Sequence, residues 1–167
     1  MIQQTIQKLT EMYLYGFAQG LKEQQESTQY GALSFEERIA MLVDKEHMKR
    51  QNSRLQARLK AARFPLAASV EDLDFSARRN LKRTEVLSLA QGAWVQNSLN
   101  IIITGPTGAG KTYMACALGE KACRDGFIVM YQKASDLSTS LLLARADGSY
   151  PKLITKLCGV KIMVIDE

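Results

Sequence analysis

Residues 99–112 read LNIIITGPTGAGKT, and this stretch sets the fold class of the chain. Its first part, 99–104, is mostly apolar and β-branched, which predicts a short buried strand. The following eight residues fit the pattern G-x-x-x-x-G-K-[ST] completely, and residues 111–124 after them predict a helix. A strand, a glycine loop and a helix in this order are the context that a phosphate-binding loop requires.

The composition of the loop matches the chemistry of phosphate binding. Glycines let the backbone approach the phosphates closely, and the loop N–H groups together with the helix N-terminus attract an anion. We expect Lys111 to reach the β- and γ-phosphates and the Thr112 hydroxyl to bind Mg²⁺. The predicted ligand is ATP, with GTP the less favoured alternative. The residues predicted to hold it are Gly105, Pro106, Thr107, Gly108, Ala109, Gly110, Lys111 and Thr112.

Residues 162–167 read IMVIDE, four apolar residues followed by two acids. This is typical of a Walker B strand, in which Asp166 holds Mg²⁺ through water and Glu167 polarises the attacking water. The alternative is a buried strand that ends in acids by chance. The position after the phosphate loop favours the Walker B interpretation. Lys111 and Glu167 are therefore the catalytic candidates, and Thr112 and Asp166 are the metal-ligand candidates.

Strands and helices alternate in the C-terminal part of the chain, which predicts an α/β fold with a parallel sheet. The expected strands cover 99–104, 127–132 and 160–165, and the expected helices cover 111–124, 135–145 and 150–158.

The N-terminal part of the chain predicts helices only. Apolar residues recur at three- and four-residue steps over 2–30. A capping box at Ser34 and Glu37 begins a second helix, which runs to about Ala62 before Pro65. A further helix is expected over 81–94, after a connector at 64–80. We expect three regions: a helical domain at 1–63, a connector with a helix at 64–98, and an ATPase core at 99–167.

The second of these helices is strongly basic. Seven basic residues lie between Lys45 and Arg63, against one acid, Glu46. A solvated helix face is the ordinary interpretation, and a nucleic-acid contact, mainly to phosphates, is the alternative. The candidate DNA contacts are Lys45, Lys49, Arg50, Arg54, Arg58 and Lys60.

The bulk composition describes a globular chain. Hydrophobic residues make up 46%, and the net charge is +5. No apolar run is long enough to span a membrane, and no signal peptide is evident, so we expect a cytoplasmic location. The cysteines form no CxxC pair. Cys116 and Cys123, seven residues apart in a predicted helix, are expected to pack in the core.

Six stretches carry a resemblance to a known family: 30–38, 70–75, 101–112, 115–119, 122–124 and 143–150. Through them, and over nearly its whole length, the chain resembles the IstB family, the ATP-binding helper proteins of bacterial insertion sequences. The resemblance implies an AAA+ ATPase with a helical N-terminal domain that binds DNA, assembles into ATP-dependent multimers and assists a partner transposase. It also favours the basic helix as a DNA contact.

In one respect the chain departs from this family, which continues well beyond the Walker B strand. In the AAA+ sheet the next strand lies between the phosphate-loop strand and the Walker B strand. We therefore expect the edges of these two strands to be open, and the 167-residue chain, as a truncated form, to bind nucleotide poorly and hydrolyse it little. The alternatives are a DnaC-type helicase loader, a non-catalytic DNA-binding remnant and, less favoured, a small-molecule P-loop kinase.

Overall fold

The computed structural model describes residues 2–75 and 81–167, which form two compact units, Met1–Gln56 and Ala57–Glu167. Helices precede a small parallel sheet, as predicted for a partial P-loop NTPase fold. The predicted connector, 64–80, includes residues 76–80, which lie outside the described residues. No helix in the described part of the chain is long and apolar enough to cross a membrane.

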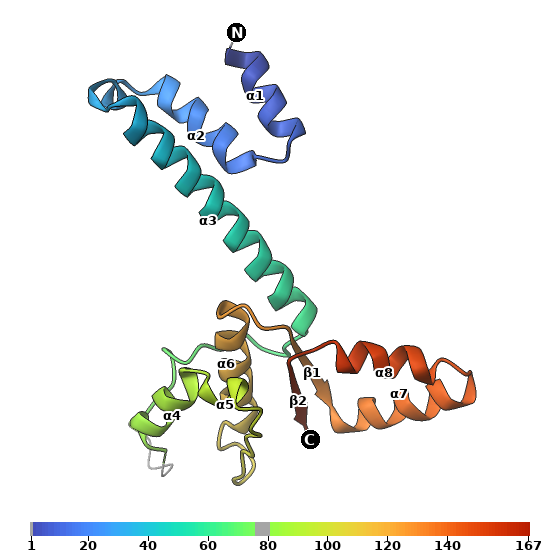
Figure 1. The fold of residues 1–167 in the computed structure, drawn as a ribbon. Helices are drawn as coiled ribbons and strands as arrows, with labels where there is room; N and C mark the ends of the chain where they lie inside the picture. The colour runs from blue at the N-terminus through green and yellow to red at the C-terminus, as the bar shows by residue number, and fades with distance from the viewer. Residues whose placement is uncertain (1, 76–80) are drawn as a thin grey trace. The chain divides into compact units, whose positions relative to one another are not determined.

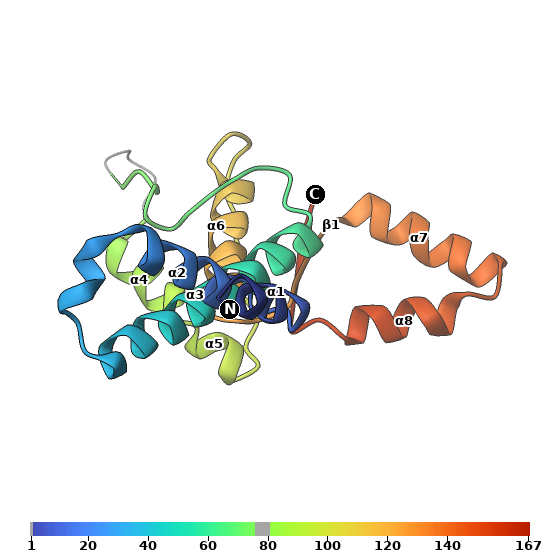
Figure 2. The ribbon, with the colours of Figure 1, turned by 90° about the horizontal axis from the view of Figure 1, so that it is seen from above.

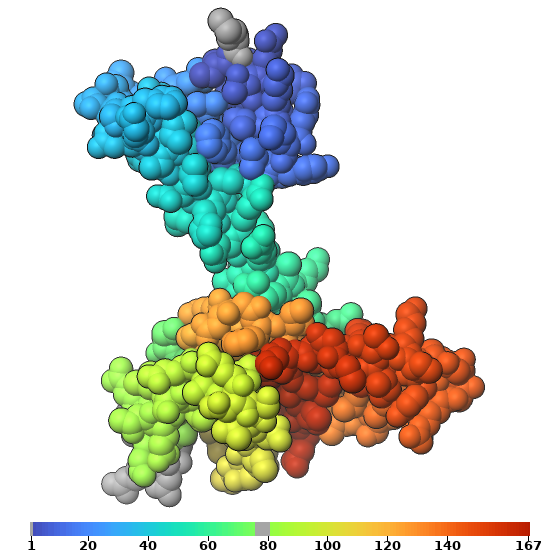
Figure 3. Space-filling view, in the orientation of Figure 1, coloured from blue at the N-terminus to red at the C-terminus, as the bar shows by residue number. Residues whose placement is uncertain are grey.

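The first unit is a group of packed helices (Figure 1; blue to teal in Figure 3). The prediction of one helix over 2–30 is wrong, because the chain reverses at Tyr13, whose φ is 60°. This reversal lets the first two helices pack together and bury Ile6 and Ala18. The elements are α1 (Ile2–Glu11), α2 (Tyr15–Glu26), the 3-10 helix η1 (Thr28–Ala32) and α3 (Phe35–Ala62), of which α3 continues into the second unit.

Helices α2 and α3 lie close together at Gly16. A β-carbon on Gly16 would lie 2.7 Å from the Cα of Glu46, so only glycine permits this approach. At the beginning of α3, Ser34 N–H donates to the Glu37 carboxylate at 2.8 Å, and Glu37 N–H donates to the Ser34 hydroxyl at 3.2 Å. This confirms the predicted capping box.

The second unit contains the sheet and the glycine loop. The helix predicted over 81–94 is divided at Gly92, whose φ of 77° interrupts the helical backbone. The helices at 111–124, 135–145 and 150–158 are confirmed. The elements are α4 (Arg83–Ala90), α5 (Ala93–Gln96), α6 (Lys111–Arg124), β1 (Val129–Lys133), α7 (Ala134–Ala146), α8 (Tyr150–Cys158) and β2 (Ile162–Asp166).

Strands β1 and β2 are parallel neighbours, with Tyr131 opposite Val164 and Lys133 opposite Asp166. The connection between them is formed by α7 and α8, which run side by side away from the sheet (Figures 1 and 2). Helix α6 packs against the sheet, and its Cys116 is 1% exposed in a core that also contains Tyr131. Burial raises the pKa of the Cys116 thiol to about 11, as expected of a core cysteine.

The prediction of a strand over 99–104 is wrong. These residues, all described, have no regular secondary structure, although Ile101 and Ile103 pack against the core while Ile102 between them is 85% exposed. The side chains of this segment thus alternate inward and outward as in a strand, but its backbone pairs with no other strand among the described residues. A cleft of about 720 Å³ separates this segment from β2, in agreement with the expected open edges.

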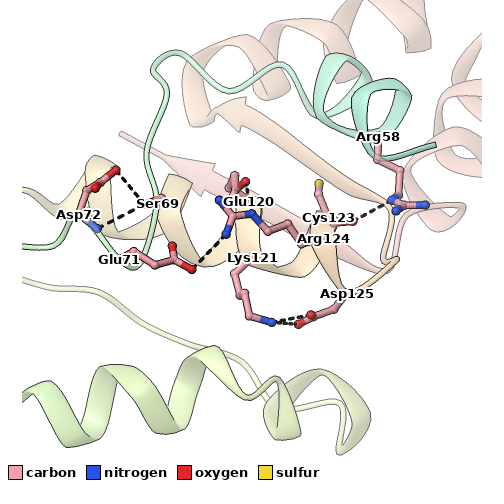
Figure 4. Close-up of polar contacts among 9 residues, drawn as sticks. All are labelled: Arg58, Ser69, Glu71, Asp72, Glu120, Lys121, Cys123, Arg124 and Asp125. Carbon is pink, nitrogen blue, oxygen red and sulfur yellow. Dashed lines mark hydrogen bonds and ion pairs between the residues drawn. The ribbon is translucent and has the colours of Figure 1, made fainter. Parts of the chain in front are cut away.

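Polar contacts attach the last turns of α3 and the chain after it to the C-terminal half of α6 (Figure 4). The Arg58 Nε donates to the carbonyl oxygen of Cys123 at 2.8 Å. Arg124 donates to Glu120 at 2.7 Å and to Glu71 at 3.0 Å. These bonds satisfy a carbonyl near the end of α6 and place the 69–72 turn beside the helix.

Candidate functional site

The glycine loop has the backbone geometry that phosphate binding requires. Gly108 and Gly110 have φ values of 79° and 91°, in the left-handed region that other L-residues rarely adopt. The Ala109 N–H closes a turn on the carbonyl of Pro106 at 3.2 Å, and α6 begins directly afterwards at Lys111. The free N–H groups at the beginning of this 14-residue helix face the loop end, where an anion binds favourably.

Lys111 lies folded over the loop from which it emerges. Its Nζ donates to the carbonyl oxygens of Gly105 at 2.9 Å and Pro106 at 3.1 Å. The ammonium group is therefore held within reach of any phosphate bound in the loop.

A hydroxyl and a carboxylate meet beside the loop. The Thr112 hydroxyl donates to Oδ2 of Asp166 at 2.8 Å, which joins the first turn of α6 to the end of β2. Hydrogen bonds from Tyr131 and Thr112 hold the pKa of Asp166 below its ordinary value, so the carboxyl is ionised. Two hard oxygen donors, one of them charged, suit a magnesium ion. The structure thus brings together Thr112 and Asp166, which lie far apart in the sequence.

Glu167 follows Asp166 directly, just beyond the end of β2. It is exposed and lines the cleft of about 720 Å³ between 99–105 and β2, a cleft that Lys111 also lines. In the part of the chain that the structure describes, no hydrogen bond joins the Glu167 carboxylate to Lys111 or Thr112. The two candidate catalytic residues, both in the described part of the chain, line the same cleft without a hydrogen bond between their side chains.

A second cavity, of about 680 Å³, is lined by the loop itself. The loop 105–110 forms one wall, and Leu73, Leu81 and Tyr113 contribute apolar surface with Asp72 beside them. Sequence reasoning missed this cavity, because nothing in the spacing along the chain places residues 72–74 next to the loop.

Sequence reasoning also missed Tyr131. Its hydroxyl donates to Oδ2 of Asp166 at 2.6 Å, the same oxygen that accepts from Thr112. The alternation along 127–132 could have placed Tyr131 on the face of Val129. The register against β2, which brings the tyrosine to Asp166, is a property of the folded sheet.

The six basic residues proposed as DNA contacts fall into two groups. Three bond to groups of their own unit: Lys45, Arg50 and Arg58. The other three are exposed, and none of them has a partner among the described residues: Lys49, Arg54 and Lys60.

Comparison with known proteins points to one family. Residues 7–167 match the family described as IstB-like ATP binding protein. The chain is 38% identical over 168 residues to an ATP-binding protein of insertion sequence IS1162 from Pseudomonas fluorescens, a match that covers 100% of this chain and 73% of the relative.

Two further relatives carry similar names. An insertion-sequence ATP-binding protein of Sinorhizobium fredii, y4pL, is 37% identical over 163 residues, covering 98% of this chain and 66% of the relative. An ATP-binding protein in an insertion sequence of Mycobacterium tuberculosis, Rv3427c, is 30% identical, covering 95% of this chain and 63% of the relative. The chain therefore spans about two thirds of the length of these two relatives.

Proposed function

Because this chain belongs to the family of IstB-like ATP-binding proteins, we propose that it binds ATP with Mg²⁺ and acts as a helper in the transposition of an insertion sequence. The contact between Thr112 and Asp166 is the observation that supports the binding of ATP with Mg²⁺. It joins the phosphate loop to the end of β2 at 2.8 Å, which is the arrangement that a magnesium ion bound to a nucleotide needs.

Different residues around the loop would bind different parts of the nucleotide and its metal ion. Gly108 and Gly110 let the backbone curve around the phosphates, and Lys111 neutralises their charge. Thr112 and Asp166 would hold Mg²⁺, which supplies further charge neutralisation to the phosphates when it is bound.

The cavity of about 680 Å³ that the loop lines suits the base of the nucleotide. Its wall combines the apolar side chains of Leu73 and Tyr113 with the carboxylate of Asp72. A flat ring stacks well on apolar and aromatic surface, and an exocyclic amino group donates to a carboxylate. Because adenine and guanine both carry such an amino group, the preference for ATP rests on the family and not on this cavity.

The partners proposed for the chain are DNA and a transposase. Support for DNA comes from the basic side chains of α3 that have no partner among the described residues: Lys49, Arg54 and Lys60. Such side chains contact mainly the phosphates of DNA, and these contacts give little sequence specificity. The transposase and the assembly into multimers are proposed by family membership. The names of the relatives favour a role in transposition over one in helicase loading.

Binding of a fluorescent ATP analogue, measured with Mg²⁺, tests the proposal. We expect saturable binding by the unchanged chain, and Lys111→Ala to weaken it at least tenfold, because the ammonium that faces the phosphates is lost. Lys152→Ala is the matched control, since it removes an exposed charge from α8, away from the loop. Absence of binding by the unchanged chain, or equal binding by Lys111→Ala, would refute the proposal.

A further inference from the structure

Tyr131 holds the carboxylate at the end of β2. Its hydroxyl donates to Asp166 at 2.6 Å, and the side chain is only 8% exposed. A charge-assisted hydrogen bond of this length is among the strong ones in proteins. In the described part of the chain, Tyr131 and Thr112 are the two hydroxyls that donate to this carboxylate.

The register of the sheet places the tyrosine where it can do this. Tyr131 stands opposite Val164, and Asp166 follows two residues later on the same face of β2. Diagonal neighbours on one face of a sheet are within reach of a long aromatic side chain. The ring packs in the core with Cys116 and Ala117 of α6, so its orientation is fixed.

Asp166 has few other restraints, among them a hydrogen bond from the backbone N–H of Glu167. It is the last residue of β2, and β1 is the single strand that pairs with β2 among the described residues. The other donor, Thr112, is itself a metal-ligand candidate, so its oxygen would turn toward a bound cation. Tyr131 would then be the side-chain donor that keeps the carboxylate in position.

We propose that Tyr131 is a positioning residue for Mg²⁺: its hydroxyl orients the Asp166 carboxylate toward the cation that accompanies the bound nucleotide. This inference rests on the proposed function, and it adds a residue from β1 to a site otherwise formed by the loop, α6 and β2. Donors that orient metal-binding side chains from behind affect metal affinity strongly, by about 10- to 100-fold when they are removed.

The test is Tyr131→Phe, which removes the hydroxyl and keeps the ring in the core. Binding of the fluorescent ATP analogue is measured in EDTA and over a range of Mg²⁺ concentrations. We expect binding in EDTA to be unchanged. Added Mg²⁺ raises the affinity for the analogue, and we expect the Mg²⁺ concentration that gives half of this rise to increase about tenfold in Tyr131→Phe. Tyr150→Phe, which removes a hydroxyl from α8, is the control and is expected to change neither quantity.

The outcomes separate this inference from the proposed function. If the unchanged chain does not bind the analogue at all, the proposed function fails. If it binds and Tyr131→Phe shows the same Mg²⁺ dependence, Tyr131 has no positioning role. An equal loss in EDTA and in Mg²⁺ indicates general damage to the fold and also overturns the inference.

A double-variant cycle gives a second, independent measurement. If Tyr131 acts through Asp166, Tyr131→Phe has no further effect on Mg²⁺ dependence once Asp166→Asn has been introduced. Additive effects of the two substitutions would overturn the inference. Because the cycle compares variants with one another, it remains informative if Tyr131→Phe lowers the overall stability.

Discussion

At the scale of single residues, Glu46 is the most constrained acid of the first unit. It is 8% exposed, and its Oε2 accepts the backbone N–H groups of Gly16 at 2.7 Å and Phe17 at 3.1 Å. Arg50 donates to its other oxygen at 2.6 Å. These bonds satisfy the free N–H groups at the beginning of α2 from a side chain of α3.

We expect Glu46→Gln to lower the free energy of unfolding at neutral pH by about 1–3 kcal/mol, because a charged acceptor of three hydrogen bonds is replaced by a neutral one. Thermal unfolding followed by circular dichroism measures this. Glu36→Gln, at an exposed position of the same helix, is the control. Equal unfolding temperatures for the two variants would contradict the assigned role of Glu46.

The same residue predicts a dependence on pH. Burial opposes the charged form of Glu46, but bonds from Arg50, Phe17 and Gly16 outweigh it and hold its pKa below the ordinary 4.5. The stabilisation is therefore complete above pH 4.5 and is lost as the pH falls through the lowered pKa. Glu46→Gln should remove this acid-dependent part of the unfolding curve.

At the scale of elements, α3 is the helix to test for DNA binding. The double variant Lys49→Ala and Arg54→Ala removes two exposed charges that have no partner among the described residues. We expect weaker binding to DNA of any sequence, and a plot of log affinity against log salt that is shallower by about one unit for each phosphate contact removed. Fluorescence anisotropy with labelled duplexes of two unrelated sequences provides the measurement.

A matched control for charge is available in the first unit. Lys22→Ala removes an exposed positive charge from α2 and should leave the salt dependence almost unchanged. If this substitution reduces the slope as much as each substitution in α3 does, binding depends on net charge alone, and α3 is not the DNA contact.

The elements also show which sequence patterns were sufficient for prediction. Helix α6 was predicted with its observed bounds, because a glycine loop precedes it and Asp125-Gly126 follows it. The long helices expected over 2–30 and 81–94 are each interrupted. Apolar spacing cannot reveal an interruption that arises from tertiary packing, such as the packing of α1 against α2.

At the scale of the whole chain, we expect slow hydrolysis of the nucleotide because a cleft lies between 99–105 and β2. Among the described residues, the loop and the end of β2 are joined by side-chain contact at Thr112 and by the packing of α6, with no strand pairing across the cleft. We infer that these 167 residues bind nucleotide weakly and hydrolyse it slowly. Phosphate release at steady state is expected to be close to that of Lys111→Ala, and a rate many times higher would contradict this.

The sequence was sufficient for the α/β class, the phosphate loop and the acidic end of β2, because these depend on local backbone chemistry and on short patterns of apolar and polar residues. The meeting of Thr112 with Asp166 could be expected from those patterns as a Walker pair. Pairing and register, in contrast, depend on backbone partners far along the chain. Only the tertiary structure could therefore show that 99–104 forms no strand, that Tyr131 reaches Asp166, and that half of the basic residues proposed for DNA already have partners.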